Sequence, residues 1–198
     1  MSKVESLEFE VKSLSDFDLN HIVYISVGPH LNETLNEIIE RKCKEVRDFK
    51  ESLWAFSSGI SERVFNLCNK YCEKDEYLYC IMVDTGMPTK TTIGKKAKYF
   101  KLDGEYIDIP EGMEVTYAKP GDYALLVDQY YKIIEDNEIY LKEYDYNDPK
   151  KYIRGFGFLN KVEIDIDSIK NKKKRLPKKI SYIAKLKKPF LVKLYESK

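Results

Sequence analysis

The chain has 198 residues, of which 43% are hydrophobic, 13% aromatic and 34% charged, and its formal net charge is +1. This composition is typical of a globular protein with one well-buried core, and it excludes a disordered chain. No apolar run approaches the roughly 18 residues that a membrane-spanning helix needs, and the first residues lack the apolar stretch of a secretory signal. We therefore expect a cytoplasmic protein without a membrane partner.

The first part of the chain, residues 1–96, alternates between strand-like and helix-like patterns. The expected elements are a half-exposed strand around residues 7–11, a buried strand at 21–27, a helix with Asn32 as its N-cap, a strand at 52–56, a helix at 61–72 and a strand at 76–85. Because the links between the elements from residue 21 onward are short, they predict a βαβαβ-like unit with a locally parallel sheet.

The helical period disappears in the second part, residues 97–167. Turn signals such as Asp103-Gly104 and Pro120-Gly121 recur there about every ten residues. This spacing predicts an antiparallel β-rich half, built as a meander or a partial barrel. No linker interrupts the chain, so the expected fold class is one α+β domain over residues 1–198, with the βαβαβ-like half, the β half and a C-terminal segment, 168–198.

That C-terminal segment is strongly basic. It contains 12 of the 34 basic residues of the chain but only 1 of the 33 acidic residues. Such a segment would bind the phosphates of nucleic acid, or it would fold back on the acidic remainder of the chain or on a second copy. Its apolar residues between Ile180 and Leu194 indicate that its second half packs against the protein. The candidate nucleic-acid-binding residues are Lys172, Lys173, Lys174, Arg175, Lys178 and Lys179.

A ligand site is expected at one edge of the predicted parallel sheet. The loops that follow its three strands would meet there, where ligands of open α/β sheets bind, and two of them lead into helix N-termini that favour anions. The spacing of these loops excludes a phosphate-binding P-loop, and ordinary Ser/Gly/Pro turns have the same composition. The candidate ligand-binding residues are Gly28, His30, Asn32, Ser57, Ser58, Gly59, Asp84, Thr85 and Lys90.

Signals for catalysis and for metals are weak. His30 with Asp84 is the candidate acid–base pair. A carboxylate stripe at 163–167 is typical of a Mg²⁺ site but is more often the solvated side of an edge strand. The four cysteines form no CxxC pair, so buried reduced thiols are expected in place of zinc. We expect no cofactor and no metal, and the sequence favours a non-catalytic protein over an enzyme.

Residues 154–159, with the letters RGFGFL, match part of the RNP1 signature of RNA-recognition motifs. The final aromatic position of that signature holds Lys161, and the companion strand is missing. The alternation along the segment predicts that Phe156 and Phe158 face the core and do not form an RNA platform. Other tyrosines would form either base-stacking surfaces or cross-strand pairs. These are Tyr130, Tyr131, Tyr140, Tyr144, Tyr146 and Tyr152.

Taken together, these patterns favour a non-catalytic binding protein for an anionic, nucleotide-like small molecule. It would be an accessory or mobile-element protein that sequesters or senses this ligand, and a homo-oligomer is compatible with the sequence. The first alternative is a nucleic-acid-binding protein that uses the basic C-terminal segment. The second alternative is an enzyme that acts on a nucleotide or a nucleic acid.

Overall fold

The centre of the structure is one long strand, β11 (Lys179–Tyr195), which pairs antiparallel with β4 (Tyr77–Asp84) and with β9 (Tyr123–Ile133). The computed structural model describes residues 10–17, 20–30, 32–56, 62–74, 77–84, 94–117, 122–134, 156–161 and 179–198. Its other strands are β1 (Glu10–Lys12), β2 (Asn20–Val27), β3 (Ser52–Phe56), β5 (Lys95–Lys96), β6 (Tyr99–Leu102), β7 (Glu105–Asp108), β8 (Thr116–Tyr117) and β10 (Phe156–Lys161).

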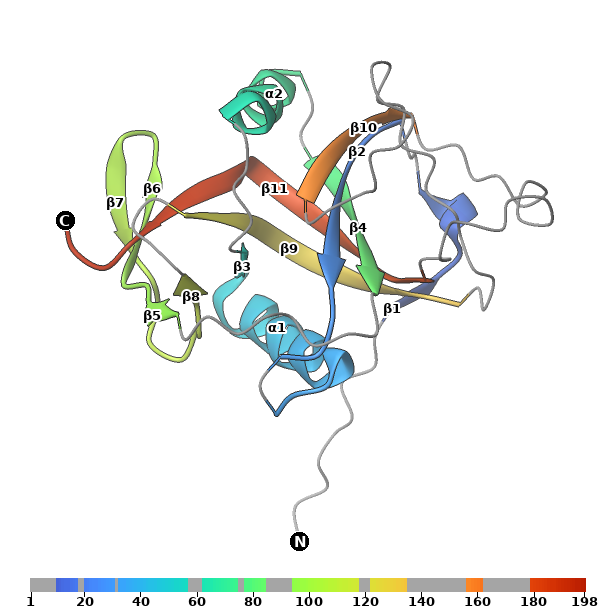
Figure 1. Cartoon of the computed structure of the whole chain (residues 1–198), viewed down its shortest axis with the longest axis horizontal. Helices are drawn as coiled ribbons and strands as arrows, with labels where there is room; N and C mark the ends of the chain where they lie inside the picture. Colours follow the sequence, from blue (N-terminus) through green and yellow to red (C-terminus); the bar gives the residue numbers. More distant parts are fainter. Residues whose placement is uncertain are drawn as a thin grey trace, which may run out of the picture.

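Among the described residues, nine strands form one mixed sheet. Its main path runs in the order β1-β9-β11-β4-β2-β10, with β3 paired to β9 and the β6–β7 hairpin paired to β11, while β5 and β8 form a separate pair. Strands β2 and β4 are parallel neighbours, and β1 is parallel to β9. Figure 1 shows β11, in red, reaching from the end of β4 to the β6–β7 hairpin. The fold is therefore of the expected α+β class, with parallel and antiparallel pairs in one open sheet.

Both α-helices contribute to the same core. Apolar side chains of α1 (Leu35–Phe49) and α2 (Glu62–Cys72) pack with residues of β2, β4, β9 and β11, and Ile39, Cys68 and Met82 are fully buried there. The N-cap of α1 is Thr34 and not Asn32 as predicted, because the Thr34 hydroxyl accepts the Glu37 N–H while the Glu37 carboxylate accepts the Thr34 N–H. Asn32 lies in an exposed turn before the helix.

A second cluster includes side chains from the other face of β2, β4 and β11. Tyr24, Ile81 and Ile183 pack there with Leu14 and Phe17. Leu14 begins the short 3-10 helix η1 (Leu14–Asp16), which has its own capping box between Ser13 and Asp16. Strand β1 (Glu10–Lys12) directly precedes these residues. It confirms the described part of the strand that was predicted around residues 7–11.

The middle strand of the predicted βαβαβ unit lies elsewhere in the sheet. The parallel pairing of β2 with β4 is present, but β3 pairs antiparallel with β9, so it runs opposite to β2 and β4. Three side chains explain this position: Leu53 is buried in a third core cluster with Ala124 and Leu126 of β9. The prediction of three parallel strands is wrong for β3, because a short apolar strand does not specify its partner.

The second half contains the predicted β6–β7 hairpin but no simple meander. Its turn is formed by Asp103 (φ 49°) and Gly104 (φ 87°), the left-handed pair that a two-residue hairpin loop requires. The next long strand, β9, pairs with β11, β3 and β1 and not with the hairpin that precedes it in the chain. Distant segments therefore complete this part of the sheet.

The second half of the basic segment is packed, as predicted. Buried residues from Ile180 to Leu194 place it in the middle of the sheet. The pairing of β11 with β9 jumps from Leu186 to Leu191, and this bulge contains the cis Lys188–Pro189 bond and the left-handed Phe190 (φ 67°). A proline is tolerated in a strand at such a bulge because it has no N–H for the ladder. Beyond the bulge, β11 continues next to β6.

The described part of the RGFGFL segment, from Phe156 onward, lies in strand β10, which pairs antiparallel with β2. Phe156 pairs with Ile25 and Phe158 pairs with Val23. The structure does not describe the side chains of Phe156 and Phe158, so their burial stays a prediction. The carboxylates at 163–167 lie outside the described residues, so their arrangement stays a prediction too.

Candidate nucleic-acid interface

The structure brings three of the sequence-predicted ligand residues to one edge of the sheet. Val27 pairs with Asp84, so the carboxyl ends of β2 and β4 coincide, and Gly28 and His30 follow directly. We call Gly28, His30 and Asp84 the β2–β4 edge. The other predicted residues are not described, with the exception of Asn32. Because β3 runs the opposite way, its carboxyl end at Phe56 pairs with Tyr123 near the other end of the sheet.

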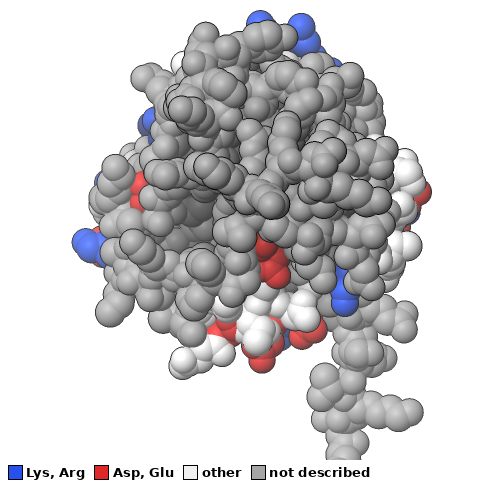
Figure 2. Space-filling model, turned by 45° about the vertical axis from the view of Figure 1, so that its right-hand side comes forward, with Lys and Arg blue, Asp and Glu red and all other residues white. Residues whose placement is uncertain are grey.

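Two acidic side chains, Glu33 and Glu37, follow the β2–β4 edge in the chain. His30 and Glu33 exchange two backbone hydrogen bonds of 3.0 Å, and the Glu33 carboxylate accepts two hydrogen bonds from Arg41, at 3.1 and 2.9 Å. The hydrogen bond with Arg41 lowers the pKa of Glu33. At the start of α1, Glu37 already accepts the Thr34 N–H, at 2.7 Å. Figure 2 shows acidic side chains gathered on the lower part of the visible face. The carboxylate of Glu37 would repel an anion at the start of α1, while the charge of Glu33 is neutralised by Arg41.

A different surface combines aromatic rings with basic side chains. The register aligns Tyr123, Lys193, Lys101 and Tyr106 across β9, β11, β6 and β7, and it aligns Tyr195 with Tyr99 in the next row. Residues that pair directly have their side chains on the same face of a sheet. We call this set of six residues the tyrosine–lysine face. Asp108 pairs with Tyr99 and borders it.

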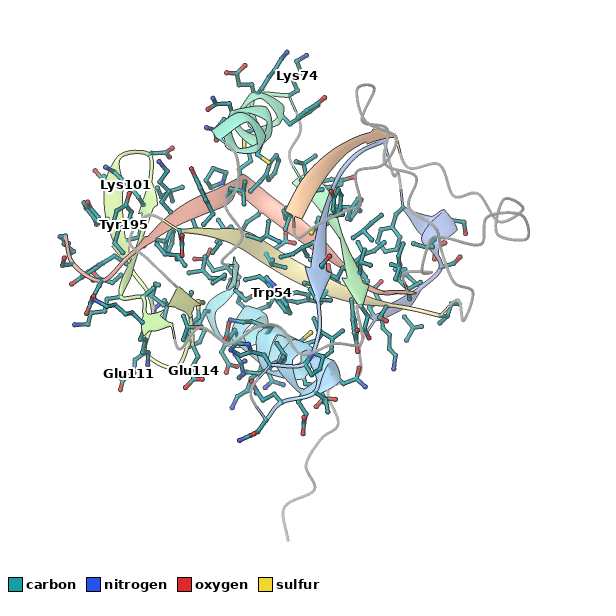
Figure 3. All side chains as sticks on the ribbon, viewed as in Figure 1. Trp54, Lys74, Lys101, Glu111, Glu114 and Tyr195 are labelled. Carbon is teal, nitrogen blue, oxygen red and sulfur yellow. The ribbon has the colours of Figure 1, made fainter. Side chains whose placement is uncertain are left out.

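The rings of this face contact one another edge to face. The centroids of Tyr106 and Tyr195 are 5.1 Å apart at an interplanar angle of 76°, and those of Tyr99 and Tyr106 are 6.3 Å apart at 85°. All four tyrosines are half-buried, so part of each ring is open to solvent. Figure 3 shows Lys101 and Tyr195 close together at the end of the molecule formed by the hairpin and β11.

Three ammonium groups lie over these rings. Lys101 Nζ is 5.3 Å from the centroid of Tyr106, and Lys193 Nζ is 5.7 Å from that of Tyr123. Lys198 Nζ is 4.8 Å from the centroid of Tyr99. Such cation–π contacts at exposed sites contribute only about 0.5–1 kcal/mol each. The ammonium groups can therefore move from the rings to an incoming phosphate at small cost.

The opposite side of these strands is buried, which holds the tyrosine–lysine face in place. Phe100, Val192 and Leu194 pack there with Met113 and Val115 of the following loop. The backbone adds hydrogen bonds from the Lys98 N–H to the Tyr195 carbonyl, at 2.9 Å, and from the Leu194 N–H to the Asp122 carbonyl, at 2.7 Å. The rings are thus presented by a rigid sheet and not by a loop.

A buried ion pair anchors that loop to α1. Lys42 Nζ donates to Glu45 Oε2 at 2.7 Å and to the Glu114 carbonyl at 3.0 Å, and the Glu114 N–H donates to Glu45 Oε1 at 3.3 Å. Desolvation lowers the pKa of Lys42 and raises that of Glu45, while their mutual attraction opposes both shifts. Because both backbone polar groups of Glu114 are bonded, we interpret the pair as a structural anchor.

The cysteines and two predicted stacking tyrosines are part of the core. Cys68 and Cys80 are buried free thiols, and burial raises the pKa of Cys68 to about 12. Tyr130 and Tyr131 are also buried, and the Tyr130 hydroxyl is 2.8 Å from Ser52 Oγ. The prediction that these two tyrosines could stack on bases is therefore wrong, since the alternation in β9 turns one toward each core cluster.

Sequence reasoning missed the tyrosine–lysine face. Each strand carries only a fragment of the signal: Tyr and Lys alternate with apolar residues in YFKL (99–102) and VKLY (192–195), and EYID (105–108) has the same spacing. These fragments do not show that the strands lie side by side. The predicted basic residues 172–175 and Lys178 lie outside the described residues, and the backbone of Lys179 pairs with Asp84 at the start of β11.

The chain matches no protein-family model, no curated protein and no solved structure. In the described part of the chain, no group of three or more His, Cys, Asp or Glu side chains is arranged to hold a metal ion. Neither α-helix is both long and apolar enough to cross a membrane.

Proposed function

We propose that this protein binds single-stranded nucleic acid on the tyrosine–lysine face. The observation that supports this most directly is the register of β9, β11, β6 and β7, which groups four tyrosines and two lysines on one side of the sheet. Proteins that bind single strands combine aromatic rings, on which bases stack, with basic side chains that contact phosphates. The same two chemical elements are adjacent here.

Binding would exchange one set of contacts for another. Bases would stack on the exposed parts of Tyr106, Tyr195 and Tyr99, and stacking on an aromatic side chain contributes about 1–3 kcal/mol per base. Lys101, Lys193 and Lys198 would leave the rings and contact phosphates. The partner would be single-stranded, since the bases of a duplex are stacked on one another and do not offer their faces to a sheet.

The experiment compares a tyrosine pair on the face with an exposed tyrosine elsewhere. A fluorescently labelled 12-nucleotide single strand is titrated with wild type and with Tyr106→Ala/Tyr195→Ala, and anisotropy is read. Loss of two stacking positions is expected to weaken binding at least tenfold. Tyr77→Ala is the matched control, because Tyr77 is 46% exposed and also has a lysine, Lys185, over its ring.

An equal loss in the Tyr77 variant, or no loss in the double variant, would contradict the proposal. Circular dichroism of each variant reports whether the sheet is intact. Since Tyr106 and Tyr195 are half-buried, Lys101→Gln is measured in parallel. Lys101 is exposed, so its replacement should weaken binding without changing the fold.

The second candidate function is sequestration or sensing of an anionic, nucleotide-like small molecule at the β2–β4 edge, by an accessory or mobile-element protein. The adjacent carboxyl ends of β2 and β4 favour it. The carboxylates of Glu33 and Glu37 weigh against it, and the Thr34–Glu37 capping box already uses two N–H groups at the start of α1. A nucleotide-induced rise in melting temperature that His30→Ala abolishes would favour this candidate.

A further inference from the structure

Asp108 places one negative charge beside the rings of the tyrosine–lysine face. It pairs directly with Tyr99, and its side chain is 77% exposed. Lys198 lies between them, with its Nζ 3.8 Å from Asp108 Oδ1 and 4.8 Å from the centroid of Tyr99. A surface that served only to attract phosphates would not require this carboxylate.

A carboxylate in this position restricts which part of a nucleotide can lie next to it. When it is ionised, it repels phosphate, and it accepts hydrogen bonds but donates none. Adenine, cytosine and guanine each carry an exocyclic amino group that can donate to a carboxylate, and acidic side chains accept from the amino group of cytosine in nucleic-acid complexes. Thymine and uracil offer a single N–H between two carbonyl oxygens, which would face the carboxylate unfavourably.

We propose that Asp108 is a specificity-determining residue that reads the edge of the base stacked on Tyr99. It favours bases with an exocyclic amino group over thymine and uracil. This inference rests on the proposed function, because a base must first stack on Tyr99. When that happens, Lys198 moves from the ring to the phosphate, and Asp108 is released from its ion pair to accept the base amino group.

The experiment measures a ratio of affinities and not a single affinity. Wild type and Asp108→Asn are titrated at pH 7.5 with labelled 12-nucleotide oligo(dC) and oligo(dT). Wild type is expected to bind oligo(dC) about fivefold more tightly, which corresponds to the lower end of the discrimination that one base contact provides. Asp108→Asn should reduce this ratio to about one, because an amide both donates and accepts and no longer distinguishes the two bases.

Asp103→Asn is the matched control. Asp103 is an exposed carboxylate of the same hairpin, and asparagine tolerates its left-handed backbone. A rise in affinity for both strands with an unchanged ratio would show that Asp108 acts only through its charge, and it would overturn the inference. Equal affinity of wild type for both strands would overturn it too while leaving the proposed function in place. No binding of either strand would overturn both.

Discussion

The two ends of strand β11 differ in chemistry. At its start, Lys179 pairs with Asp84 at the β2–β4 edge, where Glu33 and Glu37 surround the N-terminus of α1. At its end, Tyr195 pairs with Tyr99 in the tyrosine–lysine face, where ammonium groups lie over rings. The first end has the topology of a ligand site but the wrong charge for an anion. The second has the right side chains without a known ligand-binding topology.

This difference teaches that strand topology and side-chain chemistry are separate kinds of evidence. The rule that ligands bind at the carboxyl ends of parallel strands identifies where loops and helix termini converge. It does not say whether those termini are available, and the Thr34–Glu37 capping box already uses the N–H groups of both of these residues. Side-chain chemistry on a rigid surface supports a partner more directly, because stacking and phosphate contacts depend on residues that are already in place.

The largest effect is expected where the two regions are joined, at the buried pair of Lys42 and Glu45. Glu45→Ala leaves the Lys42 ammonium buried without its carboxylate, so we expect the free energy of unfolding to fall by about 3–5 kcal/mol in urea titrations. Glu40→Ala, an exposed position on the same helix, should change it by less than about 0.5 kcal/mol. Equal effects of the two substitutions would contradict a structural role for the pair.

Local patterns along the sequence predicted the elements better than their partners. The apolar runs and the 3.6-residue period predicted β2, β3, β4 and both helices, and Asp103-Gly104 predicted the hairpin turn. The partner of β3 was not predictable, because β9 follows some 70 residues later in the chain. The sequence of a short apolar strand does not say which other strand it will pair with. In β11, lysines at alternate positions masked a central strand whose apolar residues are buried.

The candidate site shows the same limit. The closeness of Gly28 to Asp84 could be predicted, since it needs only the parallel pairing of β2 with β4. The tyrosine–lysine face could not, because its residues come from β6, β7, β9 and β11, and only the register between them places Tyr106 beside Tyr195. A surface assembled from four segments leaves only short alternating patterns in the sequence.

A smaller effect is expected on the salt dependence of binding, and it tests whether the strand binds at the tyrosine–lysine face. Binding of a single strand should weaken with salt by a slope of about 0.7 per phosphate contacted. Lys101→Gln/Lys198→Gln removes two such contacts and should lower the slope of log Kd against log salt by about 1.4, measured by anisotropy between 50 and 200 mM salt, as estimated from the same relation. Lys74→Gln, in the turn that follows α2 (Figure 3), is the control and should leave the slope unchanged.

The smallest effect concerns acid stability at the β2–β4 edge. Hydrogen bonds from Arg41 lower the pKa of Glu33 from its ordinary value near 4.5, so the folded state favours the ionised carboxylate. The contribution is fully present above pH 4.5 and is lost as the pH falls through the lower pKa of the folded state. Because the pair is partly exposed, we expect only about 0.5 kcal/mol. Glu33→Gln should therefore lower stability at pH 7 and leave it near the wild-type value at pH 2–3.

Denaturant titrations of wild type and Glu33→Gln at both values of pH measure this difference. Glu37→Gln is not a neutral control, because the pKa of Glu37 is also lowered, by its hydrogen bonds with Thr34. Glu40→Gln serves better, since Glu40 is an exposed residue of α1. A stability loss in Glu33→Gln that persists unchanged at low pH would show that the ion pair with Arg41 is not its cause.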